Sequence, residues 1–401
     1  MDDRIFEAVN STVENEANFL NHISQEIWKF PELKHEEKFA HDLLTNALEK
    51  KGFSVERHYI LPTAFRAEFT SGKTGPTIVV ICEYDALPKI GHACGHNLIA
   101  ESGLGAGIAI KSALEVFPEI SGKVVVLGTP AEEGGGGKVT LIKGGAFKDV
   151  DAALMVHPSP DNHLYPPFIA ISRKTIQFTG REAHASGYPW EGLNALDAVV
   201  GAYNNLALLR QHIKPTCRVH AIITKGGEAP NVIPGNTEMK LYYRGPTNYE
   251  MENLSKRIDS CMTAAAISTG CEVSIENEDD DAYQSLMTNK TLAERYKIYA
   301  EKLGVQFDDG NNKKIPFMAS SDMGDVSHVV PSIHPTYSIG TRAVNHSVEF
   351  TQASGTPEAH LTTLITAKSM AMVALDLMQD KDFLKRAKEQ FQIDLAEDAG
   401  H

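Results

Sequence analysis

The first part of the chain alternates between amphipathic segments and short runs of apolar residues. Apolar positions at three- and four-residue spacing predict helices over residues 5–29 and 35–51. Further along, apolar runs too short for helices alternate with helical segments. The runs predicted to be buried strands cover residues 77–82, 123–128 and 152–156. Because strands that are buried on both faces occur in parallel sheets covered by helices, this alternation predicts a mostly parallel α/β sheet flanked by helices.

The pattern changes at about residue 171, where strands with partial alternation replace the continuous apolar runs. The elements predicted there follow the order strand, helix, strand, strand, helix, strand, and they cover residues 171–179, 192–212, 218–224, 237–244, 247–270 and 271–276. This order is that of the ferredoxin-like α+β arrangement. About a hundred residues suffice for a small independent domain, so we expect an insertion within a larger one.

These two patterns together predict a catalytic domain that is interrupted by a second domain. Its first part is expected over residues 1–170, the inserted domain over 171–284, and its second part over 285–401. Helices predicted over 289–303 and 357–378 would return the chain to the first domain. A chain of 401 residues is too long for one core of ordinary size, which agrees with two domains.

Composition narrows the class of protein. Hydrophobic residues make up 42% and charged residues 22% of the chain, as in soluble globular proteins, and the net charge of −14 opposes a nucleic-acid or anionic-membrane partner. No apolar run approaches the eighteen residues of a membrane span, and the first residues lack the basic-then-apolar order of a signal peptide. Five scattered cysteines suit a reducing compartment, so we expect a cytoplasmic protein.

Side chains that bind metals or transfer protons follow each of the three predicted strands. They are Asp85, Cys94 and His96 after the first strand, Glu132 and Glu133 after the second, and His157 after the third. His346 lies in a loop nearer the C-terminus. Because sites in open α/β sheets form at the carboxyl ends of strands, we expect these residues to meet at one edge.

A hydrolytic metal site would use these residue types. A pair of metal ions about 3.5–4 Å apart lowers the pKa of a bound water and polarises a carbonyl group. Cys94, His96, Glu133, His157 and His346 are suitable ligands, and Glu132 would then be free to act as a general base. We therefore expect two divalent ions at this site. Thiolate with imidazole favours zinc, while the carboxylate also admits manganese, cobalt or nickel.

Four blocks of the sequence resemble the M20 metallopeptidases, and the similarity extends over nearly the whole chain. The blocks are Glu83–Leu87, Gly91–Asn97, Pro130–Gly137 and His157-Pro158. They are most similar to the amidohydrolase branch with a cysteine ligand, which includes aminoacylases, indole-acetyl-amino-acid hydrolases and aminobenzoyl-glutamate hydrolases. Asn97 stands where many members of this branch have aspartate, and it resembles the dipeptidase and aminobenzoyl-glutamate subgroup.

The resemblance assigns roles to the candidate residues. It implies that Cys94 bridges or binds the two metals and that Glu132 is the catalytic base. It also implies that Asp85 orients a ligand. The ligands that would complete the two metal sites are His96, Glu133, His157 and His346. Glu83 and His92 are expected to support the site without binding metal.

The same resemblance implies that the inserted domain is a lid and dimerisation domain, and hence that the protein is a homodimer. His184 resembles a histidine that stabilises the oxyanion, often in the partner subunit's active site. Asn231 and Arg244 resemble groups that hold the substrate, and arginine suits a carboxylate through its bidentate fork. Gly340 is expected to offer its backbone near the substrate.

The sequence therefore predicts a metal-dependent hydrolase that cleaves the amide bond of small N-acyl amino acids or dipeptides. One alternative keeps the metal site and cleaves another C–N bond, in an aryl amine or a carbamoyl group. A second is a cysteine hydrolase that uses Cys94 with His96, and chelation separates it from a metal enzyme. A third is a non-catalytic binding scaffold, which predicts the loss of Glu132 or of ligands, whereas all are present.

Overall fold

The computed structural model describes residues 2–278, 282–308 and 319–400, and these form two compact units. Unit 1 consists of Met1–Pro167, Leu286–Phe317 and Asp322–Glu397. Unit 2 consists of Phe168–Ser285, Met318–Ser321 and Asp398–His401.

Unit 1 is built on a six-stranded sheet. The strands, in spatial order, are β1 (Ser54–Arg57), β2 (Phe65–Thr70), β4 (Lys123–Thr129), β3 (Thr77–Glu83), β5 (Ala152–Leu154) and β11 (Ser332–Ile333). The last four run parallel to one another, while β1 and β2 pair antiparallel. The mostly parallel sheet is thus confirmed.

The apolar run of β3 explains why its sequence does not alternate. Ile78 and Val80 pack into the core on one face of the sheet, and Val79 and Ile81 pack into the core on the other. Both faces of the strand are buried, so the run Ile78–Cys82 is apolar throughout. The third predicted strand is wrong in one respect, because β5 ends at Leu154 and the chain pairs again as β6 (His157–Ser159) with β12 (Thr336–Ser338) in a separate two-stranded sheet.

Unit 1 also contains helices that lie around this sheet. They are α1 (Asp3–Asn15), α2 (Ala17–Lys29), α3 (Lys38–Lys50), α4 (His96–Val116), α5 (Gly137–Lys143), α8 (Lys290–Lys302), α9 (Met323–Ser327), α10 (Val348–Ser354), α11 (Pro357–Gln379) and α12 (Lys381–Asp398). The single helix expected over 5–29 is wrong, because the regular helix is interrupted at Glu16, which is both the C-cap of α1 and the N-cap of α2 although its backbone stays in the αR region. Both helices pack against α4. The sequence analysis did not predict α10 or α12.

The central helix α4 lies close to the sheet because glycine lines its contact face. A Cβ atom on Gly103 would lie 2.4 Å from the carbonyl oxygen of Ile81, and one on Gly107 would lie 2.3 Å from Val126. On its other side α4 contacts α11. Among the described helices, α11 is long and apolar enough to cross a membrane by length and composition, with mean hydropathy 1.4, but 83% of its apolar window is buried inside the structure, as in a core helix.

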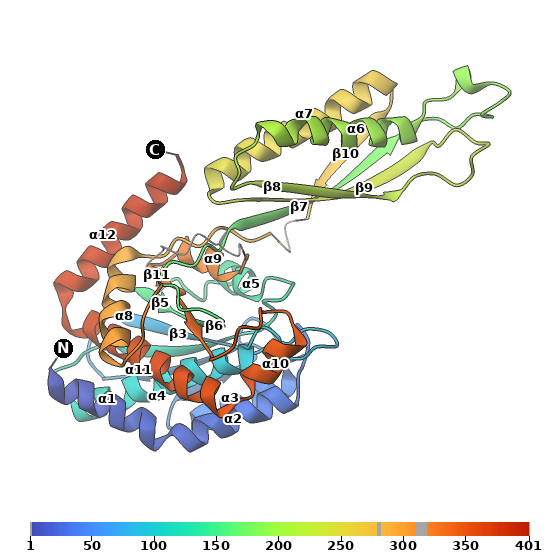
Figure 1. Cartoon of the computed structure of the whole chain (residues 1–401). Coiled ribbons are helices and arrows are strands. Elements are labelled where there is room, and N and C mark those ends of the chain that lie inside the picture. The colour runs from blue at the N-terminus through green and yellow to red at the C-terminus, as the bar shows by residue number, and fades with distance from the viewer. Residues whose placement is uncertain (1, 279–281, 309–318, 401) are drawn as a thin grey trace. The chain divides into compact units, whose positions relative to one another are not determined.

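Unit 2 has the predicted ferredoxin-like arrangement. Its elements are β7 (Ala170–Thr179), α6 (Ala195–Leu209), β8 (Arg218–Lys225), β9 (Asn236–Gly245), α7 (Asn248–Thr269) and β10 (Glu272–Asn277). The antiparallel sheet has the order β10-β7-β9-β8, and α6 and α7 lie together over one of its faces (Figure 1). The Thr247 side chain accepts the N–H of Glu250 and caps α7.

Candidate metal centre

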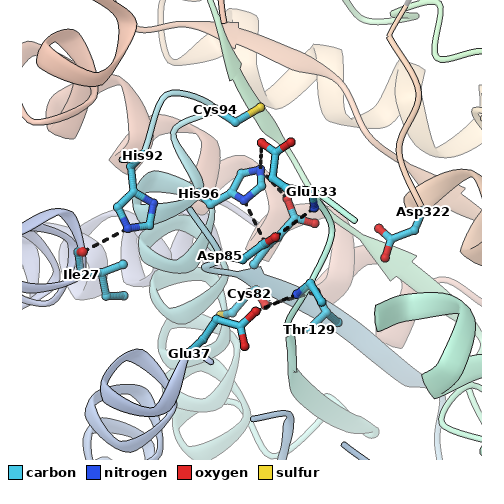
Figure 2. A network of polar contacts seen from close by, with 12 residues as sticks. Ile27, Glu37, Cys82, Asp85, His92, Cys94, His96, Thr129, Glu133 and Asp322 are labelled. Atoms are coloured by element: carbon cyan, nitrogen blue, oxygen red, sulfur yellow. Dashed lines mark hydrogen bonds and ion pairs between the residues drawn. The ribbon is translucent and has the colours of Figure 1, made fainter. Parts of the chain in front are cut away.

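The carboxyl ends of β3, β4 and β5 bring the candidate ligands to one edge of the sheet in unit 1 (Figure 2). Two groups of three residues have ligand atoms that lie within 4.8 Å of one another. The first group is Cys94, His96 and His157, and the second is Cys94, Glu133 and His346. The structure therefore brings together the five predicted ligands in two trios that share Cys94.

The loops that carry these ligands are shaped by residues with positive φ. Gly95 has φ +76° and starts α4 at His96, so the histidine lies on the first turn of the helix. Ala131 has φ +61° directly before Glu132, and His346 itself has φ +65°. Residues other than glycine rarely adopt this conformation, and they do so where the surrounding contacts hold them, often at functional sites.

Two of the histidines have one ring nitrogen engaged and the other directed at the centre. His96 Nδ1 donates to Asp85 Oδ1 at 3.1 Å, and Asp85 Oδ2 accepts the N–H of Glu133 at 2.9 Å. His157 Nδ1 donates to the carbonyl oxygen of Pro158 at 2.7 Å. In both rings Nε2 is then left as the ligand atom. Asp85 therefore contacts two of the predicted ligands, one through each of its carboxylate oxygens.

Side-chain atoms of the predicted ligands converge at this centre. His96 Nε2 and Glu133 Oε1 are buried and lie 3.9 Å apart, and His96 Nε2 is also 3.1 Å from Glu83 Oε1. Glu133 Oε1 is 3.4 Å from His346 Nε2, and Cys94 Sγ is 3.4 Å from His157 Nε2. Ligand atoms that share a tetrahedral zinc ion lie roughly 3.3–3.8 Å apart, given metal–ligand bonds of about 2.0–2.3 Å. Buried polar atoms in this spacing fit a bound metal.

The charges around Cys94 favour its thiolate. Burial alone would raise the pKa of Cys94, but the charge and hydrogen bond of His157, with hydrogen bonds from His346 and His96, hold this pKa well below its ordinary value. Burial likewise opposes a charge on His96, yet the charge of Glu83 and the hydrogen bond to Asp85 raise the pKa of His96. A thiolate is the form of cysteine that binds metals.

Glu132 lies beside these ligands in a strongly acidic surrounding. Its side chain is buried, and it forms a third close group of possible ligands with Glu83 and His96. Burial, followed by the charges of Glu83 and Glu133, raises the pKa of Glu132 well above its ordinary value. A carboxyl group with a raised pKa can hold a proton near neutral pH, as a general acid–base residue must.

The structure also shows a buried lysine that the sequence analysis missed. Lys138 Nζ donates to Asp322 Oδ1 at 2.7 Å and to Glu83 Oε2, and the three side chains are inaccessible to solvent. Asp322 Oδ2 also accepts the backbone N–H of Lys138 at 2.9 Å. A lysine on the first turn after the glycine run was the available signal, but Asp322 is 184 residues further along the chain and only the fold brings it there.

His92 and Asn97, which flank Cys94 and His96, make hydrogen bonds to other parts of unit 1. His92 Nε2 donates to the carbonyl oxygen of Ile27 at 3.0 Å, and burial lowers the pKa of His92 to about 3, so the ring stays neutral. Asn97 Nδ2 donates to the carbonyl oxygen of Ser354 at 3.0 Å and to Ser24 Oγ at 3.1 Å. An aspartate at position 97 would place a carboxylate against that carbonyl oxygen and could not donate to it. The hydrogen bond to Ser354 therefore explains why asparagine suits this position.

The predicted oxyanion and substrate residues His184, Asn231 and Arg244 lie in unit 2. His184 Nδ1 accepts the backbone N–H groups of Ser186 and Gly187 at 3.3 and 3.1 Å, so its ring proton lies on Nε2. His184 pairs with Val232, the neighbour of Asn231.

Arg244 lies near the C-terminal end of β9, and its Nη1 donates to Ser320 Oγ at 2.8 Å. Gly340 belongs to unit 1, and its φ of +78° favours glycine.

Comparison with known proteins identifies the family. The chain is 45% identical over 398 residues to the Xaa-Arg dipeptidase of Mus musculus, a match that covers 96% of this chain and 92% of the relative. The chain belongs to the M20 family of metallopeptidases and amidohydrolases. Residues 171–269 of this M20 protein match the family described as "Peptidase dimerisation domain". It is thus a metal-dependent amide hydrolase, as the sequence predicts.

More distant M20 proteins agree over nearly the full length. A p-aminobenzoyl-glutamate hydrolase chain of Escherichia coli is 29% identical over 463 residues, covering 97% of this chain and 95% of the relative. The fold is that of a dinuclear metal-binding M20 peptidase from Bacillus subtilis, with TM-score 0.71 at 18% identity, covering 90% of this chain and 99% of that chain. The subgroup suggested by Asn97 is among these relatives.

Proposed function

We propose that this protein is a dinuclear metal dipeptidase that releases a cationic C-terminal residue, above all arginine, from dipeptides. The observation that supports the hydrolytic chemistry is the pair of ligand trios that share Cys94, with Glu132 beside them. The similarity to an Xaa-Arg dipeptidase supports the substrate class. An Xaa-Arg dipeptide carries a net charge of about +1 at neutral pH, so a protein of net charge −14 attracts it at long range.

In the mechanism that we propose, Cys94 contributes to both metal sites, His96 and His157 complete one, and Glu133 and His346 complete the other. Two divalent ions held there would supply an activated water and a polarised carbonyl group. Glu132 would take a proton from that water at its carboxylate and then give it to the amine nitrogen as the C–N bond breaks.

Residues around the centre position these groups. Asp85 keeps His96 Nε2 and the Glu133 backbone directed at the centre. His184 offers an Nε2–H donor of the kind that stabilises an oxyanion, because its Nδ1 already accepts two backbone N–H groups.

A panel of dipeptides that differ in one feature tests the substrate class. The purified, metal-loaded protein would be assayed with Ala-Arg, Ala-Lys, Ala-citrulline and Ala-Glu. Citrulline matches arginine in size but is neutral, so a kcat/KM for Ala-Arg at least tenfold above that for Ala-citrulline supports a charge-reading site. Equal values for the two would refute cationic selectivity.

A second panel tests the bond that is cleaved. N-acetyl-arginine, p-aminobenzoyl-glutamate and an N-carbamoyl amino acid represent the acyl, aryl amine and carbamoyl alternatives. Faster hydrolysis of any of these than of Ala-Arg would replace the dipeptidase proposal with that activity. Loss of activity on chelation, with recovery on adding metal, separates all of them from a cysteine hydrolase based on Cys94.

We also propose that the protein works as a homodimer through unit 2. Strand β8 is at the edge of the sheet, where its Ile222 is 64% exposed, and an exposed apolar edge strand favours pairing with another chain. His184 contacts the segment before β9 begins at Asn236, whereas Arg244 lies near the far end of β9, roughly 25 Å away at the rise of a strand. One small substrate cannot contact both residues of a single copy, so we propose that the partner copy supplies one of them.

Light scattering tests this assembly. We expect twice the chain mass for the wild type and a shift towards a monomer for Ile222→Asp. A wild-type protein that is monomeric and active at assay concentrations would refute the dimer.

We propose zinc as the metal that the thiolate and imidazole donors favour, with manganese as the alternative. Elemental analysis of protein purified without added metal tests this, and a manganese content above that of zinc would favour the alternative. We further propose a cytoplasmic location, since all five cysteines are free and Cys94 must stay reduced to bind metal. Fractionation of the source cells tests it.

A further inference from the structure

The loop that carries Glu132 and Glu133 is contacted by a segment near the N-terminus. We call Pro130–Gly137 the base loop, and the segment that contacts it is Lys34–Glu37. A Cβ atom on Gly134 would lie 2.6 Å from Lys34 Nζ, and one on Gly135 would lie 2.5 Å from His35 Nε2. These two side chains thus lie directly against the glycine run.

Glu37 makes the polar contact between the two segments. Its Oε1 accepts the backbone N–H of Ala131 at 3.0 Å and that of His35 at 2.9 Å, while its Oε2 accepts the hydroxyl of Thr63 at 2.7 Å. Glu37, Thr63 and Ala131 are all buried. Figure 2 shows the Glu37 side chain directed from its helix towards the chain beyond Thr129.

Ala131 needs this support because its backbone conformation is unfavourable. Its φ of +61° costs a residue with a Cβ about 1–2 kcal/mol. On one side Ala131 donates its N–H to Glu37, and on the other its carbonyl oxygen accepts the N–H of Gly137 at 3.3 Å. The conformation of Ala131 sets the direction in which the next residue, Glu132, leaves the strand.

We propose that Glu37 is a positioning residue, which holds Ala131 in its left-handed conformation and thereby aims Glu132 and Glu133 at the metal centre. Nothing in the sequence pattern marks Glu37 for this role, because it lies next to Glu36 at the start of an amphipathic helix. The proposal rests on the assignment of Glu132 and Glu133 above, but its structural part does not depend on the substrate.

Two substitutions at position 37 separate this role from general stabilisation. Glu37→Asp keeps the charge and places a residue type favoured at helix N-caps at the N-cap of α3, but withdraws the carboxylate by about 1.5 Å, the length of one C–C bond. Glu37→Gln keeps the length, and its amide oxygen can accept from Ala131 and His35 while its NH₂ group faces Thr63. Asn289→Ala is the matched control, because Asn289 is a buried cap of α8 that makes its contacts with Leu292 and Ala387.

The first readout uses metal-free protein and requires no activity. Hydrogen exchange measured by mass spectrometry would follow the peptide that contains residues 130–137. We expect Glu37→Asp to speed exchange there at least about tenfold, and Glu37→Gln and Asn289→Ala to leave it within about twofold of the wild type. Unchanged exchange in Glu37→Asp would overturn the proposal even if the protein proves to have another substrate.

The second readout is turnover of the best dipeptide at saturating metal. Misplacement of a catalytic group by about 1 Å costs up to about 100-fold in rate, so we expect kcat of Glu37→Asp to fall about 10- to 100-fold while KM changes less. Glu37→Gln should retain most of kcat. If Glu37→Gln is as slow as Glu37→Asp, or if Asn289→Ala loses as much kcat for an equal loss of stability, Glu37 is not a positioning residue.

Discussion

Lys138→Met tests whether the buried lysine stabilises the carboxylates beside the metal centre. In the wild type, Lys138 Nζ contacts Glu83 and Asp322, and the three side chains have no solvent exposure. Methionine matches the aliphatic stem of lysine but cannot donate, so the change removes the charge and leaves the volume similar.

The structure sets the size of the effect. Removing one partner of a buried ion pair costs about 3–5 kcal/mol. Each carboxylate keeps another contact, because Asp322 still accepts the Lys138 backbone N–H and Glu83 still lies 3.1 Å from His96 Nε2. We therefore expect the free energy of unfolding to fall by about 3–5 kcal/mol at pH 7, and not by twice that amount.

The loss should also depend on pH. Burial, partly offset by Lys138, raises the pKa of Asp322 to about 6. Without Lys138 the pKa of Asp322 rises further, so Asp322 stays protonated above pH 6 in the folded variant. In the unfolded chain and in the folded wild type, Asp322 is ionised above that pH. A group whose folded pKa is raised stabilises at low pH and loses that contribution as pH rises. The difference in free energy of unfolding between the wild type and Lys138→Met should therefore grow by about 1.4 kcal/mol per pH unit between about pH 6 and 8.

Urea unfolding of the metal-free protein measures both quantities. The chain has two tryptophans, and Trp190 of unit 2 is 71% exposed, so a Trp190→Phe background leaves Trp28 to report on unit 1. Lys138→Met combined with Asp322→Asn should recover at least half of the loss. A deficit below about 1 kcal/mol, or one that is equal at pH 6 and pH 8, would refute this account of the lysine.

Other substitutions address the centre itself. Glu132→Gln should keep the metal content and reduce kcat by about 10²–10⁴-fold, as expected for loss of a general base, and turnover near the wild-type value would exclude that role. Cys94→Ser should weaken both metal sites at once, because Cys94 belongs to both trios, so elemental analysis should show less than one ion per chain; loss of a single ion would show that it does not bridge. His184→Ala should lower kcat more than metal content, and an equal loss of both would make it a ligand or a structural residue. Burial raises the pKa of Glu37 to about 7, so the wild type should lose up to about 3 kcal/mol of stability as pH rises from 4.5 to 7. Glu37→Gln cannot titrate and should lack this part of the pH dependence, and identical stability–pH profiles of the two proteins would contradict this.

The comparison of prediction and structure is clearest at the strand ends. Cys94, His96, Glu133, His157 and His346 were predicted as ligands, and within each of the two trios the structure places their ligand atoms within 4.8 Å of one another. This was predictable because parallel strands end at one edge, so residues just after different strands are neighbours whatever their separation in sequence.

The elements that the sequence missed have weaker local signals. The break at Glu16 carries no glycine or proline, and the partly buried side of α12 includes the polar Gln390 and Asp394 beside its apolar residues. Strand β5 stops at Leu154 because its neighbour β11 has only two residues, Ser332 and Ile333. Such limits are set by the partner in space.

The sequence by itself determined the order of elements, the ferredoxin-like insertion and the chemical types gathered at the centre, because hydrophobic periodicity and strand ends are local properties. Only the tertiary structure decided which distant groups support that centre. Asp322 reaches Lys138 across 184 positions and Glu37 reaches Ala131 across 94. A buried charge or a strained backbone residue needs a stabilising contact, and here that contact comes from a residue distant in sequence that local patterns do not predict.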